Sequence, residues 1–131
     1  MKRLAAVLVM ALGLSTVLVA CSSGPTINVT MTDFSYSPTS FTVPAGARVT
    51  LHAKNNGTVE HEFAIMKKDT SVTPPFGDKD EGNIYWELDA IAPGTSKSAT
   101  FTAPSEPGDY EVICGLAGHI EKGMVATLTV K

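Results

Sequence analysis

One short loop near the C-terminus carries three side chains that can bind a metal ion. Cys114, His119 and Met124 supply a thiol, an imidazole and a thioether, and four residues separate each of them from the next. Sulfur and imidazole ligands suit soft and borderline transition metals, whereas magnesium and calcium prefer oxygen. The loop therefore predicts a transition-metal site that needs ligands from elsewhere in the chain.

A second imidazole completes a known ligand set. Two histidines and one cysteine in a trigonal arrangement, with a weak axial methionine, form the copper sites that transfer electrons. The remaining histidines are His52 and His61. In the strand pattern His61 shares a face with the apolar Phe63, while His52 shares a face with Thr50. We therefore expect His61 to be the second histidine ligand and His52 to be exposed.

The two ends of the loop pass the same test of strand faces. Cys114 aligns with Tyr110 and Val112, and Met124 aligns with Ala126. In an antiparallel hairpin the end of one strand and the start of the next meet at the same pole. Each residue alone also fits a structural role, as a buried thiol, a strand histidine or a methionine that fills a gap. Their combination on core-facing positions predicts a copper site.

Alternating apolar and polar residues between regular turn signals predict the rest of the fold. We expect about eight short strands, no helix after residue 20 and no internal repeat, which indicates an all-β, antiparallel sandwich. The charged segment 67–83 is expected to be a solvated loop. The expected strands lie at residues 27–31, 41–43, 49–53, 60–66, 84–90, 99–101, 110–114 and 124–130.

The ligand segments resemble those of a known family. Residues 55–63, Asn-Asn-Gly-Thr-Val-Glu-His-Glu-Phe, together with Cys114, His119 and Met124, resemble the cupredoxin (type 1 blue copper) family. Within that family the loop spacing is similar to that of the auracyanins, rusticyanins and sulfocyanins. The resemblance implies a Greek-key β-sandwich with one type 1 copper at one end. It also implies that His61, Cys114 and His119 are equatorial ligands and Met124 is the axial ligand.

The resemblance also implies a contact surface for redox partners. In cupredoxins the edge of the loop histidine reaches the surface inside an apolar patch, for which Leu116, Ala117 and Ile120 are the candidates here. The alternative is that Leu116 and Ile120 pack inward over the site. The chain departs from many relatives at two positions, with Glu62 in place of an asparagine and Ala117 in place of a proline. These changes predict the loss of a side-chain hydrogen bond beside the ligands and a less rigid loop.

The ligand set separates three classes of function. A single copper held by four protein ligands has no open position for a substrate, which favours an electron carrier serving redox proteins. Copper enzymes of related fold need additional histidine-ligated copper, and this chain has three histidines, of which two are already assigned. We therefore expect no catalysis. A copper-delivery or storage protein would more naturally carry a Met/His-rich tract, which the sequence lacks, but this class remains the alternative.

The first residues have the pattern of a signal peptide. Lys2 and Arg3 precede residues 4–20, which contain no charged residue. The segment ends in Leu-Val-Ala-Cys at residues 18–21, which resembles a bacterial lipobox and predicts cleavage before Cys21 and a lipid on its thiol. The alternative is a retained membrane span, for which about 17–25 apolar residues are enough. The expected domains are a signal peptide at 1–20, a lipidated tether at 21–25 and a cupredoxin domain at 26–131.

Length and composition fit one domain, which we expect to be exported and monomeric. The chain has 131 residues, and removal of the leader leaves 10 − 2 = 8 basic and 13 − 0 = 13 acidic residues, a net charge near −5. No basic stripe is present, so nucleic acid is not an expected partner. Cys21 and Cys114 are the two cysteines. They can form a disulfide in an exported protein, but lipidation of Cys21 leaves Cys114 free for a metal. We expect a lipid anchor in a bacterial membrane, with the domain facing the periplasm or the cell exterior.

Overall fold

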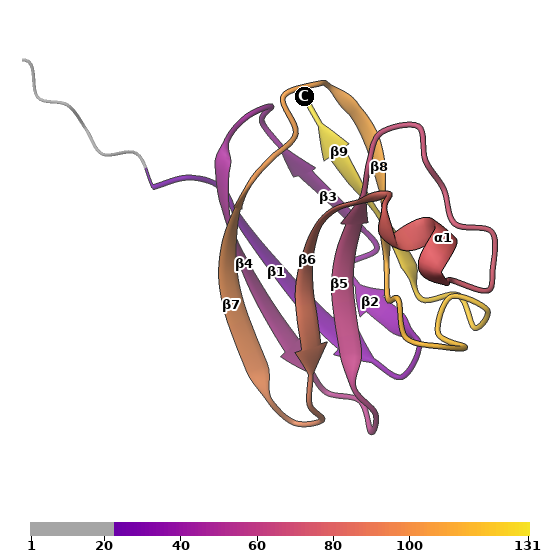
Figure 1. Ribbon diagram of the computed structural model, residues 1–131. Coiled ribbons are helices and arrows are strands. Elements are labelled where there is room, and N and C mark those ends of the chain that lie inside the picture. Colours follow the sequence, from indigo (N-terminus) through magenta and orange to yellow (C-terminus); the bar gives the residue numbers. More distant parts are fainter. Residues whose placement is uncertain (1–22) are drawn as a thin grey trace, which may run out of the picture.

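The computed structural model describes residues 23–131, which form two β-sheets packed face to face (Figure 1). The expected leader and the lipid-bearing Cys21 lie outside the described residues. The four-stranded sheet has the order β2-β1-β4-β7, formed by β2 (Ser35–Ser37), β1 (Thr26–Thr32), β4 (Arg48–Asn55) and β7 (Ser96–Thr102). The five-stranded sheet has the order β3-β9-β8-β5-β6, formed by β3 (Ser40–Val43), β9 (Val125–Val130), β8 (Gly108–Ile113), β5 (His61–Met66) and β6 (Ile84–Ile91).

The expectation of an all-β, Greek-key sandwich is confirmed. The chain passes from one sheet to the other between β2 and β3, β3 and β4, β4 and β5, β6 and β7, and β7 and β8. The sheets are mixed, because β1 pairs with β4 and β3 pairs with β9 in parallel, whereas the remaining pairs are antiparallel. Sequence alternation could not reveal this, since it reports which face of a strand is buried and not the direction of its neighbour.

The described residues contain nine strands and one short helix, against the expected eight strands and no helix. The additional strand, β2, has three residues and ends before Pro38, so it is too short to give an alternating pattern. The helix α1 (Asp78–Glu81) lies in the charged segment that was expected to be a loop. Between residues 23 and 131 no helix is long and apolar enough to cross a membrane.

The core lies between the sheets and consists of the alternate apolar residues that the sequence pattern selects. Phe63, Ile65 and Leu128 are fully buried in it. The outer face of β5 is covered as well, because Ala64 and Met66 belong to a second apolar cluster. That cluster includes residues from segment 67–83 and from the loop after β8, and its buried members are Ala64, Met66, Val72, Ile113 and Ile120. Both faces of β5 are therefore packed, which holds the start of that strand in a fixed position.

Candidate metal centre

Three strand ends meet at one pole of the sandwich and carry three of the four expected ligands. His61 opens β5, Cys114 follows the last residue of β8, and Met124 precedes β9. The Cys114 N–H donates to the Met124 carbonyl at 3.4 Å, which closes the β8–β9 ladder at this pole. All three side chains are fully buried. The prediction that they occupy core-facing positions at one end of the fold is confirmed.

The loop between β8 and β9 turns His119 back toward this pole. Gly118 (φ 82°) and Gly123 (φ 92°) adopt left-handed backbone conformations that other residues rarely adopt. The His119 N–H donates to the Leu116 carbonyl at 3.1 Å, and the His119 carbonyl accepts from the Met124 N–H at 3.0 Å. These bonds fix the loop without a proline at Ala117. The backbone on both sides of His119 is therefore held in a compact set of turns.

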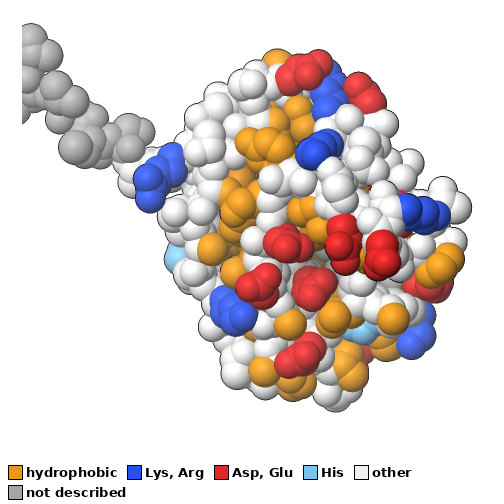
Figure 2. Space-filling view, viewed as in Figure 1, with side chains coloured by type: hydrophobic (Ala, Val, Ile, Leu, Met, Phe, Trp, Pro, Cys, Tyr) orange, Lys and Arg blue, Asp and Glu red, His pale blue; other side chains and the backbone are white. Residues whose placement is uncertain are grey.

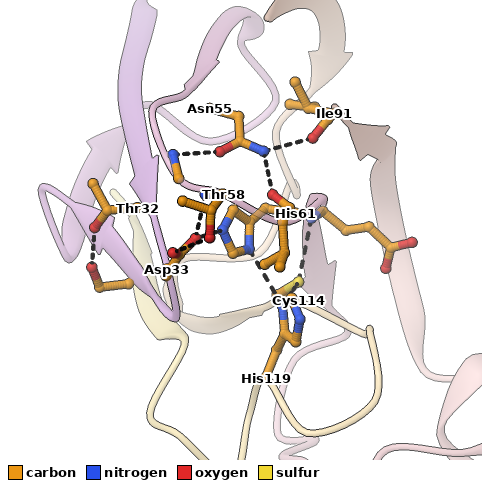
Figure 3. A network of polar contacts seen from close by, with 12 residues as sticks. Thr32, Asp33, Asn55, Thr58, His61, Ile91, Cys114 and His119 are labelled. Atoms are coloured by element: carbon orange, nitrogen blue, oxygen red, sulfur yellow. Dashed lines mark hydrogen bonds and ion pairs between the residues drawn. The ribbon is translucent and has the colours of Figure 1, made fainter. Parts of the chain in front are cut away.

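The side-chain donors of His61, Cys114 and His119 converge in the interior. Their donor atoms lie within 4.8 Å of one another. The two Nδ1 atoms are 3.3 Å apart, and Cys114 Sγ lies 3.2 Å from His119 Nδ1 (Figure 3). Such separations allow one ion to contact all three donors, since metal bonds to imidazole and thiolate are about 2.0–2.3 Å long in tetrahedral zinc sites. Both histidines therefore present Nδ1 as the ligating atom.

Burial and nearby backbone groups set the charge of the site. Burial raises the pKa of the Cys114 thiol, while the N–H groups of Glu62 and Leu116 oppose that rise. The Glu62 N–H donates to Cys114 Sγ at 3.3 Å. Burial also lowers the pKa of His119, and His61 and Lys122 lower it further, so its neutral, metal-binding form is favoured. A metal that binds here takes the place of the thiol proton.

The β1–β2 turn provides supporting contacts that the sequence patterns did not predict. The Phe34 ring packs edge-on against the His119 ring at 5.1 Å between centroids. The Tyr36 hydroxyl donates to the Glu62 carbonyl at 2.5 Å, which steadies the peptide segment whose N–H faces Cys114. Phe34 has a φ of 64°, so this turn uses a conformation that is uncommon outside glycine. Asp33 and Phe34 directly follow the alternating strand β1, and nothing in that pattern indicates a contact with the ligands.

The structure places the other predicted residues as follows. His52 is exposed, and its Nδ1 lies 2.6 Å from Ser98 Oγ, so it is remote from the donor cluster as expected. Ala117 is exposed and Leu116 is partly buried against the core. The expectation that Ile120 belongs to an exposed patch is wrong. Its side chain is 8% exposed and packs into the second apolar cluster, because the turns around His119 direct it toward β5 and β8.

The donor set fits a copper ion. One thiolate, two imidazoles and a buried thioether residue form the combination that blue-copper sites use, and hard cations would find no oxygen ligand among the three converging donors. In addition, His61 Nε2 is the one buried side-chain nitrogen or oxygen among residues 23–131 without a hydrogen-bond partner, and it points away from the cluster. A Greek-key sandwich with this cluster at one pole defines the class of single-copper, type 1 proteins.

The chain belongs to the cupredoxin family, because the model of the cupredoxin-like domain matches residues 4–130. It is similar to the dithionite-reduced auracyanin of the photosynthetic bacterium Roseiflexus castenholzii, with 30% identity, a TM-score of 0.69, and coverage of 83% of this chain and 98% of that chain. It is 27% identical to the copper-resistant cuproprotein CopI of Rubrivivax gelatinosus, over 86% of this chain and 70% of that protein. It is 25% identical to the sulfocyanin of Sulfolobus acidocaldarius, over 66% of this chain and 47% of that protein, so it spans about half of that relative's length.

Replacement of Met124 by leucine should leave copper bound and raise the reduction potential. Met-to-Leu exchange in a core conserves volume and costs less than about 1.5 kcal/mol, so the fold is retained. Loss of a weak axial donor destabilises the oxidised ion more than the reduced ion. If the loss weakens Cu(II) about tenfold more than Cu(I), the potential rises by about 59 mV.

Voltammetry of the Met124→Leu variant and of the unmodified protein measures this change. Met66→Leu is the matched control, since Met66 is equally buried but lies in the second apolar cluster. A clear decrease in potential for Met124→Leu, or an equal rise in both variants, would contradict an axial role for Met124.

Proposed function

We propose that the protein is a type 1 copper protein that carries single electrons between redox proteins outside the cytoplasm. His61, Cys114 and His119 would hold the copper equatorially, and Met124 would be its axial ligand. Bound copper supplies one-electron oxidation and reduction. The protein's own residues hold the two oxidation states in one geometry, so that little rearrangement accompanies electron transfer.

Burial of the donors is the observation that carries this proposal. His61, Cys114 and Met124 have no solvent exposure, and the fourth residue, His119, is 8% exposed. A site closed in this way excludes water and leaves no coordination position for a substrate. It therefore supports outer-sphere electron transfer and argues against catalysis by this domain. His119 is also the ligand through which an electron would pass most directly to the surface.

Absorption spectroscopy tests the proposed function. Addition of one equivalent of Cu(II) to the apoprotein should give a strong thiolate-to-copper charge-transfer band in the visible region, and ascorbate should abolish it reversibly. The rate of electron exchange with a second redox protein should be fast compared with the rate of copper release. A colourless complex, or copper that leaves on each reduction, would contradict the proposal.

The contact surface for a partner is proposed around Ala117 and Leu116. These residues adjoin His119, and Ala117 is the exposed member. Acidic side chains gather over β5, β6 and α1 (Figure 2). This group reaches the proposed contact surface, because a Cβ atom on Gly115, the residue before Leu116, would lie 3.1 Å from Glu62 Oε2. Burial raises the pKa of Glu62 first, and the nearby carboxylates of Glu87 and Asp89 raise it further, which reflects the density of negative charge there. This distribution suits a partner with a basic docking surface.

A charge placed at Ala117 should slow electron exchange without changing the copper site. We expect Ala117→Glu to lower the self-exchange rate of the copper protein by about tenfold at low ionic strength, because like charges would face each other in the encounter. The visible spectrum should stay the same. Self-exchange is measured from NMR line broadening in mixtures of reduced and oxidised protein.

Ala45→Glu provides the matched control for net charge. Ala45 is exposed at the opposite pole, where its N–H donates to the carbonyl of Lys131. Equal self-exchange rates for the two spectrally normal variants would mean that electrons leave by a route other than the His119 surface.

We further propose that a lipid on Cys21 anchors the domain to a bacterial membrane. Support comes from the charge-free segment 4–20 and the Leu-Val-Ala-Cys ending at residue 21. The first strand begins at Thr26, so the tether would be short. Intact mass measurement of the exported protein tests this, because lipidation adds a diacylglyceryl mass that Cys21→Ser abolishes. A water-soluble protein cleaved elsewhere would contradict the proposal.

Copper handling is the second candidate function, and similarity to a copper-resistant cuproprotein favours it. In that case the protein would bind copper for storage or delivery, with no redox partner. The two functions differ in exchange kinetics, since a delivery protein must release its ion to an acceptor. Rapid copper transfer to a competing Cu(I) chelator, together with slow electron self-exchange, would favour copper handling over electron transfer.

A further inference from the structure

The orientation of His61 leaves one of its ring nitrogens in need of a partner. Its Nδ1 faces His119 Nδ1 at 3.3 Å, and its Nε2 is buried without a hydrogen bond. A neutral imidazole that gives Nδ1 to a metal must carry its proton on Nε2. A buried N–H without an acceptor costs about 1–3 kcal/mol. The copper-bound form of His61 therefore requires an acceptor on the Nε2 side.

Asp33 lies at that position. Its Oδ1 is 3.5 Å from His61 Nε2, and Figure 3 shows the carboxylate of the β1–β2 turn directed at the outer edge of the imidazole. The separation is at the limit of a hydrogen bond, so a small inward shift of the turn would bring the two atoms into bonding range. No further change of the His61 ring is needed, since Nδ1 already faces the other donors.

Thr58 holds the Asp33 carboxylate in place. The Thr58 N–H donates to Oδ1 and the Thr58 hydroxyl donates to Oδ2, each at 2.7 Å. Both carboxylate oxygens of Asp33 therefore accept a hydrogen bond from one residue, which fixes the orientation of the group. Because Oδ1 has a second lone pair, it can accept from His61 while it keeps the bond from Thr58.

The backbone between Asp33 and His61 permits this approach only with glycine. A Cβ atom on Gly57 would lie 2.3 Å from Asp33 Oδ1 and 2.9 Å from His61 Nε2. The Asn55 side chain fixes Gly57, since its Oδ1 accepts the Gly57 N–H at 2.8 Å while its Nδ2 donates to the carbonyls of Val59 and Ile91. The loop before β5 is therefore built around the contact between the carboxylate and the imidazole.

We propose that Asp33 is a positioning residue for the copper site, which accepts the Nε2–H of His61 and so holds Nδ1 toward the metal. Carboxylates behind ligating histidines fix the tautomer and ring orientation and raise the basicity of the ligand. A more basic imidazole stabilises Cu(II) more than Cu(I), so Asp33 lowers the reduction potential. This inference depends on the proposed copper site and adds a residue that makes no bond to the metal.

Asp33→Asn tests the proposal with little change in shape. We expect Cu(II) affinity to fall by about 10–100-fold, as for other residues that support metal ligands, with a smaller loss for Cu(I). The reduction potential then rises by about 59 mV for each factor of ten by which the loss of Cu(II) affinity exceeds the loss of Cu(I) affinity. Thr58→Val, which removes one anchor of the carboxylate, should raise the potential by a smaller amount.

Asp109→Asn is the matched control. Asp109 also accepts a hydrogen bond at 2.7 Å from a threonine hydroxyl, that of Thr129, and it lies toward the opposite end of the same sandwich. This variant makes the same change in net charge and should leave the potential, the Cu(II) affinity and the visible spectrum as in the unmodified protein. A rise in potential confined to the Asp33 and Thr58 variants supports the proposal.

Nitrogen-15 NMR of the diamagnetic Cu(I) protein gives a readout that a merely structural role would not change. The Nε2–H of His61 should exchange slowly with solvent in the unmodified protein and rapidly in Asp33→Ala. The proposal would be overturned if the unmodified protein shows the visible copper band but the Asp33 and Asp109 variants have the same reduction potential and the same rate of hydrogen exchange at His61 Nε2–H. Absence of that band from the unmodified protein would instead overturn the proposed copper function itself.

Discussion

Cys114→Ser should abolish the visible charge-transfer band completely while the apoprotein stays folded. The thiolate is the strongest donor of the set, and the covalency of its bond to copper would give the colour. Serine is smaller and can still accept the Glu62 N–H that approaches Cys114 Sγ at 3.3 Å. The cost of placing a hydroxyl in this buried position is about 1–3 kcal/mol, less than the stability of a typical domain.

Three measurements check the Cys114→Ser prediction. Far-ultraviolet circular dichroism and urea unfolding report the fold of the apoprotein, and an absorption spectrum after addition of Cu(II) reports the site. Among residues 23–131 Cys114 is the one free thiol, so no other described cysteine can replace it. An intense visible band in a folded Cys114→Ser protein would mean that the thiolate does not bind the copper.

Much of the site could be predicted from the sequence because its ligands stand at the ends of alternating strands. Cys114, His61 and Met124 each continue the buried face of a strand, and that periodicity is a local property of the chain. The short loop then brings His119 near the same point. Fold class followed from the same alternation together with the turn signals.

The supporting residues could not be predicted, because their roles depend on contacts between segments far apart in the chain. Asp33 in the β1–β2 turn meets Thr58 in the β4–β5 loop and His61 at the start of β5, and Phe34 meets His119. A lone aspartate after a strand carries no signal of such a contact. Ile120 was placed wrongly for the same reason, since the cover over the outer face of β5 comes from segment 67–83, whose path no periodicity describes.

The effect of Glu62, which stands where many relatives have asparagine, also depends on tertiary structure. Relatives with asparagine at this position suggested that its side chain makes a bond beside the ligands. In this protein the contact with Cys114 Sγ comes from the Glu62 backbone N–H, and the Tyr36 hydroxyl steadies the same residue through its carbonyl. Backbone contacts of this kind are independent of side-chain type, so the substitution leaves them intact.

His61→Ala should abolish the visible copper band, whereas His52→Ala should leave it unchanged. Both variants remove one of the three imidazoles of the chain. His61 is fully buried with Nδ1 in the donor cluster, and His52 is exposed beside Ser98 on the other sheet. Loss of a residue that merely supports a ligand costs about 10–100-fold in metal affinity. Loss of the ligand itself should therefore cost at least a hundredfold, which is about 2.8 kcal/mol.

Calorimetric titration with Cu(II) and the absorption spectrum measure both effects, and circular dichroism confirms that each apoprotein is folded. His52→Ala should change stability by less than about 0.5 kcal/mol, as expected for an exposed position. The pair of variants also tests the register of the strands, since a shift by one residue exchanges the buried and exposed faces. If His61→Ala bound copper normally and His52→Ala did not, the second histidine ligand would be His52 of β4. The copper site would then lie against the four-stranded sheet, and its assignment to His61 would be wrong.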